Sequence, residues 1–110
     1  MSPQALASLL ACLMGVYLTP ALAGGVPTVP PAHYDHPHPD MLVIERSPAE
    51  VDRICRAIGA HSRSNSRIVA CAPIGKARCA IVIPVSHPQK AALVRHERGH
   101  CNGWPADHPR

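Results

Sequence analysis

The chain has 110 residues, a formal net charge of +4 and 3% aromatic residues, which together indicate one small domain with a limited hydrophobic core. Its 11 basic residues are scattered, without the dense basic run or the aromatic platform of a nucleic-acid interface. We therefore expect a solvated basic surface and no nucleic-acid partner.

Residues 1–23 have the pattern of a secretory signal peptide. The apolar run at residues 5–18 has the length of a signal-peptide core and is too short to span a membrane. An A-x-A cleavage site ends at Ala23, so the mature protein would begin at Gly24. A lipoprotein box ending at Cys12 is the less favoured alternative, because the apolar stretch before it is short. The sequence thus predicts a periplasmic or secreted protein with no stable membrane anchor.

Residues 24–40 consist largely of Pro, Gly and His. This composition is typical of an extended linker that cannot bury a core. We expect the histidines of this segment to be solvated, with metal capture as the alternative: His33, His36 and His38.

A first helix is predicted to follow Ser47. Ser47 stands at the N-cap, Pro48 at the first helical position and Glu50 at the third, which is the arrangement of a capping box. Gly59 is expected to end this helix. Apolar residues at helical spacing mark its buried face: Val51, Ile54, Cys55 and Ile58.

Two runs rich in Ile and Val, residues 67–73 and 78–84, have the composition of β-strands. The connection between them is short, so a β-hairpin is predicted. Residues 79–83 are apolar throughout, as expected for a strand that is buried on both faces. Residues 41–44 are another short apolar run that suits a strand. The order helix, hairpin, helix predicts a minimal α+β domain over residues 41–110.

A second helix is predicted over roughly residues 88–102. Ser86 and Gln89 have the spacing of a capping box at its start. Gly103 offers a left-handed C-cap, and Pro105 prevents the helix from continuing.

This second helix carries the pattern His96-Glu97-x-x-His100. Positions i and i+4 share one face of a helix, so both histidines can point a ring nitrogen at one metal ion. Glu97 lies one position round the helix, where its carboxylate would reach a metal-bound water instead of the metal. The pattern predicts a zinc site with His96 and His100 as ligands and Glu97 as the catalytic base.

The HExxH helix resembles the active-site helix of the zincin metallopeptidases, and with Gly103 its HExxHxxG pattern is similar to the metzincin branch. In metzincins the third ligand lies three positions after the glycine, which here is Ala106 and cannot bind a metal. The resemblance therefore implies a displaced third ligand. The tail from His96 onward is also similar to that of short bacterial exported proteins.

His108 is the expected third ligand, and Asp107 is the alternative. His108 is close to the helix and follows a Gly-Trp-Pro turn. A residue folded back from upstream, such as His61 or His87, is a further candidate.

Four cysteines remain after signal cleavage, which in a small exported domain indicates two disulfides. A zinc site made of thiolates is the weaker alternative, because no CxxC pair exists. Three pairings are possible. We favour Cys55 with Cys71 and Cys79 with Cys101, which would tie the first helix to the first predicted strand and the second strand to the zinc helix.

The resemblance implies a zinc-dependent hydrolase with Zn2+ as cofactor and a peptide or protein as substrate. A second donor to the developing oxyanion would be Tyr34, an arginine or His87, and the sequence does not choose among them. The main alternative is a non-catalytic periplasmic metal-binding or interaction protein, because so small a domain can hardly form two lobes around a substrate. A disulfide-stapled binding module without metal is the third reading.

Overall fold

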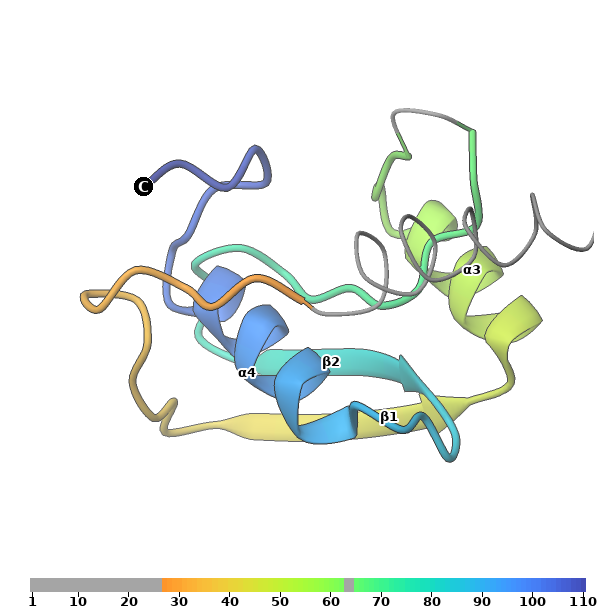
Figure 1. The fold of residues 1–110 in the computed structure, drawn as a ribbon, viewed down its shortest axis with the longest axis horizontal. Helices are drawn as coiled ribbons and strands as arrows, with labels where there is room; N and C mark the ends of the chain where they lie inside the picture. Colours follow the sequence, from red (N-terminus) through yellow and green to blue (C-terminus); the bar gives the residue numbers. More distant parts are fainter. Residues whose placement is uncertain (1–26, 63–64) are drawn as a thin grey trace, which may run out of the picture.

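The computed structural model describes residues 27–62 and 65–110. The predicted signal peptide and its cleavage site lie outside the described residues. The elements follow one another as strand, helix, strand and helix (Figure 1): β1 Met41–Arg46, α3 Pro48–Ala57, β2 Cys79–Pro84 and α4 Lys90–Cys101. The domain is therefore a small α+β unit, as predicted. None of the helices in this part of the chain is long and apolar enough to cross a membrane.

The two strands form a parallel pair, and this corrects the predicted hairpin. β1 lies beside β2 in a register that runs from Met41 opposite Cys79 to Arg46 opposite Pro84. Residues 67–73, the other half of the expected hairpin, contribute one antiparallel bridge between Cys71 and Val82. The fully apolar β2 therefore has neighbours on both edges. The partner of β2 on one edge is β1, and this pairing depends on the crossover of the chain through α3. The residues that predicted a hairpin carry no information about that crossover.

Helix α3 begins as the sequence predicts. The Ser47 side chain accepts the backbone N–H of Glu50, and its hydroxyl donates to the Glu50 carboxylate at 2.9 Å. Gly59, with a φ of +103°, follows the last turn in the left-handed region that a glycine adopts without strain. Val51 and Cys55 are fully buried, but Ile58 is 61% exposed, so the predicted apolar stripe stops one turn early.

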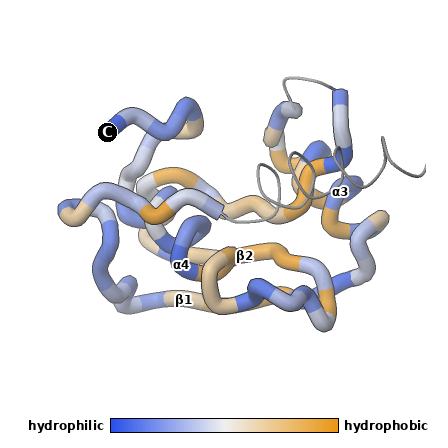
Figure 2. Tube along the Cα trace, in the orientation of Figure 1, coloured by the Kyte–Doolittle hydropathy of each residue, from blue (hydrophilic) through white to orange (hydrophobic). Residues whose placement is uncertain are grey.

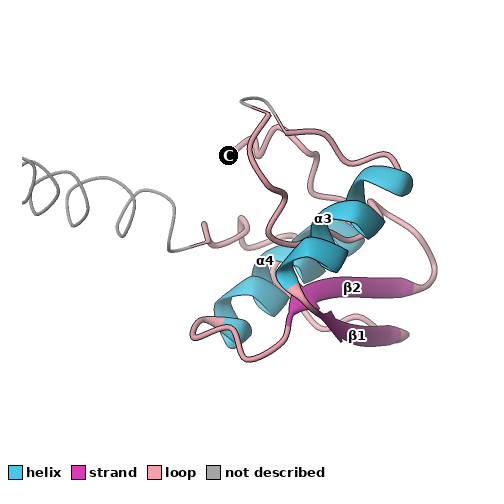
Figure 3. Cartoon of the chain, turned by 90° about the vertical axis from the view of Figure 1, so that its right-hand side faces the viewer, coloured by secondary structure: helices cyan, strands magenta, loops and turns pink. Residues whose placement is uncertain are grey.

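Side chains of β2 alternate between two core clusters. Cys79, Ile81 and Ile83 pack with Leu93 and Cys101 of α4. Val82 points the other way, into a cluster with α3. Figure 2 shows β2 as a hydrophobic stretch of the chain, and Figure 3 shows the two helices beside the two-stranded sheet.

Each cluster contains one disulfide, and both favoured pairings are present. Cys55 is bonded to Cys71, and Cys79 to Cys101. The first bond joins α3 to the segment beside β2, and the second joins β2 to α4. Two disulfides in a small domain indicate that it folds in an oxidising compartment.

Helix α4 ends as expected but starts differently. After the C-cap Asn102, Gly103 adopts a φ of +107°, and its N–H donates to the His100 carbonyl while the N–H of Trp104 donates to Gly99, which is a Schellman motif. The predicted capping box is wrong, because Ser86 lies in a left-handed turn. Gln89 is the N-cap, and its N–H is taken by the His87 ring at 3.0 Å, so the helix begins at Lys90.

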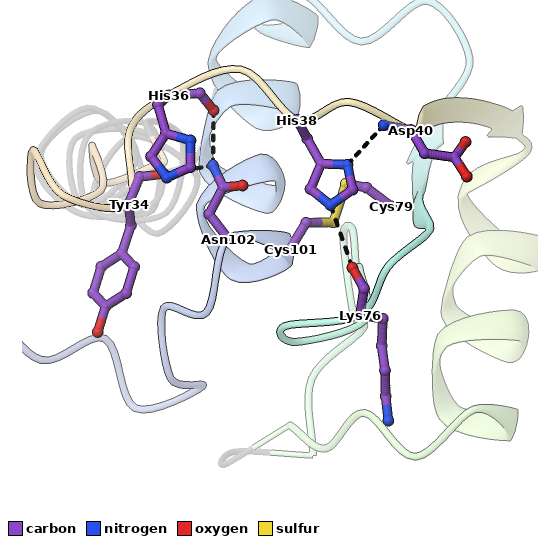
Figure 4. The surroundings of a disulfide bond; sticks show 8 residues. All are labelled: Tyr34, His36, His38, Asp40, Lys76, Cys79, Cys101 and Asn102. Atoms are coloured by element: carbon purple, nitrogen blue, oxygen red, sulfur yellow. Dashed lines mark hydrogen bonds between the residues drawn. A yellow bond between two sulfur atoms is a disulfide. The ribbon is translucent and has the colours of Figure 1, made fainter.

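Residues 27–40, which we call the strap, lie along α4 (Figure 1). This differs from the extended linker that we expected from their composition. Pro30 is buried, and Asp35 pairs with Arg95 and Arg98 of α4. Figure 4 shows Asn102 between the main chains of Tyr34 and His36.

Candidate metal centre

Three histidines converge beside the C-terminal half of α4. His96 and His100 project from one face of the helix, and His108 reaches them from the tail. The Nε2 atom of His108 lies 3.1 Å from Nε2 of His96 and 3.1 Å from Nε2 of His100. Within residues 27–62 and 65–110, these three form the one group of side chains placed to hold a metal ion.

Main-chain carbonyls fix the ring orientation of both helical histidines. The Nδ1 atom of His96 lies 2.8 Å from the carbonyl oxygen of Thr28, and Nδ1 of His100 lies 2.6 Å from that of Trp104. A carbonyl oxygen can only accept, so each Nδ1 must carry the hydrogen. The neutral rings then turn the lone pair of Nε2 toward the centre of the group, which is the form that binds a metal.

This arrangement fits a bound cation better than a hydrogen-bonded cluster. If His96 and His100 both present lone pairs, a hydrogen on His108 Nε2 can satisfy only one of the two contacts. A cation between the three nitrogens would satisfy all of them. Zinc binds imidazole nitrogens at about 2.0–2.1 Å in tetrahedral geometry, which places neighbouring ligand nitrogens about 3.3 Å apart. The observed spacing of 3.1 Å is close to this value.

Burial favours the neutral form of His96 and His100. It lowers the pKa of His96, with a smaller contribution from the neighbouring rings and against the opposing effect of the Thr28 carbonyl. Burial likewise lowers the pKa of His100, against the effect of its bond to Trp104. Both shifts disfavour the imidazolium form, which cannot bind a metal.

Trp104 forms the wall of the centre. Its side chain is 1% exposed, and its ring stacks on His100 with centroids 4.9 Å apart. The rings of His96 and His108 meet it edge-on at 5.1 and 4.8 Å. The indole N–H donates to the Pro109 carbonyl at 2.9 Å. Trp104 thus packs against all three histidines and encloses them on one side.

The tail delivers His108 through a turn. The N–H of His108 donates to the Pro105 carbonyl at 3.0 Å, and His108 has a φ of +57°. Ala106 lies within this turn, and the next positions bring His108 to the group. Asp107 is exposed and is not part of the group, and neither is His61.

Glu97 lies on the neighbouring side of α4, beside a cleft. The cleft has a volume of about 260 Å³ and is lined by residues from the strap, from the segment before β2 and from α4: Pro27, Val69, Ala70, His87, Leu93, His96 and Glu97. Glu97 is 6% exposed, and none of the described residues donates a hydrogen bond to its carboxyl. Burial raises its pKa to about 8.

His87 also lines this cleft, although it is not a ligand. Its Nδ1 accepts the N–H of Gln89, so the hydrogen of the neutral ring is on Nε2. Tyr34 is not among the residues that line this cleft, and the same holds for every described arginine. Of the three kinds of oxyanion donor that the sequence left open, the cleft therefore contains His87.

Sequence reasoning missed the strap residue that holds His96. The carbonyl oxygen of Thr28 lies 2.8 Å from His96 Nδ1 and its hydroxyl oxygen 3.4 Å, so the shorter contact is made by a main-chain atom that every residue carries. The acidic Asp35, within a segment rich in Pro and His, was the available sign that the segment packs against the basic face of the helix.

No protein-family model, curated protein or solved structure matches this chain. The resemblance to zincins rests on the sequence of the HExxH helix and its tail.

Proposed function

We propose that this chain is an exported zinc-dependent hydrolase that cleaves a peptide or protein substrate with a metal-activated water. The observation that carries the proposal is the convergence of the three Nε2 atoms, with both helical rings held by main-chain carbonyls. Structural zinc sites have four protein ligands, whereas catalytic sites have three and keep a position for water. A set of three histidines therefore supports a catalytic site over a structural one.

Zinc held by His96, His100 and His108 would lower the pKa of a bound water to about 7 and polarise the scissile carbonyl. The proposed role of Glu97 is to accept the proton of that water and pass it to the leaving amine. Its carboxyl follows a ligand in sequence and shares a cleft with it. The raised pKa of Glu97 belongs to the metal-free protein, and a divalent cation nearby favours the carboxylate.

His87 is the proposed second donor to the oxyanion. Its Nε2–H is the free donor of a neutral ring, and it lines the same cleft as Glu97. A donor placed where negative charge develops is worth several kcal/mol in reactions of this kind.

A non-catalytic metal-binding protein is the second candidate. The observation in its favour is the burial of Glu97, which is 6% exposed and lines a cleft of about 260 Å³ between the strap and residues 69–70. Zinc would then serve to pin the tail to α4 and stabilise the domain. In either case the two disulfides and the signal-like residues 1–23 support a periplasmic or secreted location.

The test combines metal content with turnover in the oxidised protein that begins at Gly24. Elemental analysis should find one zinc per chain. Glu97→Gln should keep this zinc, because it removes a base and no ligand, and should lose hydrolysis of a casein or peptide-library substrate by about two orders of magnitude or more. His87→Gln should also lower kcat with the zinc retained.

Two outcomes would decide against the proposal. A wild-type protein that binds no zinc would remove the metal centre itself. A wild type that binds zinc but cleaves no better than Glu97→Gln would favour the non-catalytic candidate.

A further inference from the structure

The strap reaches the metal centre through its main chain. The Thr28 carbonyl accepts the Nδ1–H of His96 at 2.8 Å, across 68 positions of sequence. The comparable bond of His100 comes from Trp104, which lies directly after the same helix. One helical ligand is therefore oriented locally, and the other depends on a distant segment.

We propose that the strap is a positioning element of the metal centre, in which Thr28 holds His96 in its metal-binding tautomer and metal affinity depends on docking of the strap on α4. This inference rests on the proposed zinc site. It assigns a role to a segment whose composition suggested a linker.

Packing against Gly99 holds the strap close to the ligands. A Cβ atom on Gly99 would lie 2.5 Å from Cγ and 2.8 Å from Cβ of Pro30, and 3.1 Å from Cε3 of Trp104. The missing side chain therefore lets Pro30 rest directly on the helix between His96 and His100. Pro30 is two residues after Thr28, so this contact sets where the Thr28 carbonyl lies.

Polar contacts hold the rest of the strap. Asp35 pairs with both Arg95 and Arg98, which lie on either side of the first ligand in sequence. The Asn102 amide donates to the carbonyls of Tyr34 and His36 at 2.8 and 2.7 Å (Figure 4). Arg98 and Asn102 of the HExxH region therefore contact the strap.

The C-terminal tail contacts both the strap and His96. A guanidinium N–H of Arg110 donates to the Val29 carbonyl at 3.0 Å, next to the carbonyl that holds His96. His108 reaches the same ring at its other nitrogen. His96 is thus held at Nδ1 by the strap and faces the tail at Nε2, so metal binding and docking of both segments favour one another.

The experiment releases the strap without changing α4. The variant Pro30→Gly/Asp35→Asn removes the packing contact and the ion pairs, and Val29→Ala, whose side chain is 44% exposed, is the matched control. Zinc affinity is measured by competition with a chromophoric chelator. The tautomer of His96 in the metal-free protein is read from the chemical shifts of its ring nitrogens in ¹⁵N-labelled samples.

We expect metal-free wild type and Val29→Ala to show His96 with its hydrogen on Nδ1. The double variant should shift this ring toward the Nε2–H form and bind zinc about 10–100-fold more weakly, the usual cost of losing such a partner. A loss of stability alone would not change the tautomer. If the double variant fails to fold, Val29 replaced by its α-hydroxy acid gives a second test, because an ester weakens the Thr28 carbonyl as an acceptor and leaves the side chains unchanged.

The inference is overturned if His96 carries its hydrogen on Nε2 in the metal-free wild type, or if a folded variant keeps its zinc affinity within about twofold. A wild type that shows the Nδ1–H form but binds no zinc would refute the proposed function and leave the role of the strap in orienting His96 intact.

Discussion

His108 is held differently from the other two histidines. His96 and His100 project from a helix, and their rings are fixed by carbonyl acceptors. His108 lies on the exposed tail with a φ of +57°, a left-handed conformation that costs free energy in a residue other than glycine. We therefore expect its contribution to metal affinity to be the most sensitive to the state of the tail.

His96→Ala and His100→Ala should each abolish stoichiometric zinc binding, because one helical ligand alone cannot fix the metal. His108→Ala should weaken binding by more than about 100-fold and leave a remnant, since Asp107 is adjacent and can take its place. Asp107→Asn is the matched control and should bind zinc as the wild type does. Chelator competition measures all of these variants. A larger loss in Asp107→Asn than in His108→Ala would reassign the third ligand.

The sequence predicts the three histidines better than it predicts the contacts that orient them. The i, i+4 spacing places His96 and His100 on one helical face whatever the rest of the fold does, and proximity along the chain favours His108. Thr28 acts through a main-chain atom, and its nearness to His96 arises from tertiary packing across the strap. No pattern of residue types encodes such a contact.

Gly99 should not tolerate alanine, even though it lies within a helix. Helix propensity alone would favour Gly99→Ala by about 1 kcal/mol. The added Cβ would instead collide with Pro30, which is rigid, and overpacking of this kind typically costs about 1–3 kcal/mol. We expect a net loss of unfolding free energy, measured by chemical denaturation of the metal-free protein.

Pro30→Gly should rescue part of this loss in the double variant, because it removes both atoms that the new Cβ meets most closely. A Gly99→Ala protein that is more stable than wild type would show that the strap does not rest on the helix at this point.

At the scale of elements, the attachment of the strap to α4 depends on the charge of Asp35. The hydrogen bond from Arg95, followed by the charges of Arg95 and Arg98, lowers the pKa of this carboxyl below its usual value near 3.8. A carboxyl whose pKa is lowered by folding stabilises the folded state at pH values above its ordinary pKa. This contribution is lost as the pH falls through the lowered pKa. Acid should therefore release the strap.

Asp35→Asn should make the loss of stability between about pH 5 and pH 2 less steep than in the wild type, because one linked proton is removed. The unfolding free energy of the metal-free protein is compared across this range, with Asp107→Asn as the control that makes no ion pair with any described residue. An identical pH profile for Asp35→Asn and wild type would contradict the role of this ion pair.

Local signals predicted the helices better than the sheet. Ser47 and Gly59 mark the ends of α3 because capping is decided within a few residues, and Gly103 marks the end of α4 for the same reason. The partner of β2 is β1, which lies some forty positions earlier, and its pairing depends on the crossover through α3. Strand pairing over such a distance has no local signature, so the expected hairpin failed.

At the scale of the whole molecule, the candidate metal centre lies where the strap and the tail meet at α4. The strap and the tail both reach α4, and α4 is itself anchored to β2 by the Cys79–Cys101 bond. The Cys55–Cys71 bond lies in the other core cluster, with α3. Both disulfides therefore stabilise the same small domain, but only the Cys79–Cys101 bond is attached to the helix that carries His96 and His100.

This difference gives a test that separates stability from site geometry. The loops closed by the two bonds span 22 and 16 positions, so their chain-entropy contributions differ by only about 0.3 kcal/mol, and removal of either should cost about 2–4 kcal/mol. Cys79→Ala/Cys101→Ala should in addition weaken zinc binding, because α4 loses its covalent anchor one residue after His100. Cys55→Ala/Cys71→Ala should be destabilised to a similar extent and keep the zinc affinity of the wild type. Denaturation midpoints and chelator competition at a temperature where both variants are folded measure the two effects, and equal zinc affinities would mean that the strap and tail alone fix the geometry of the site.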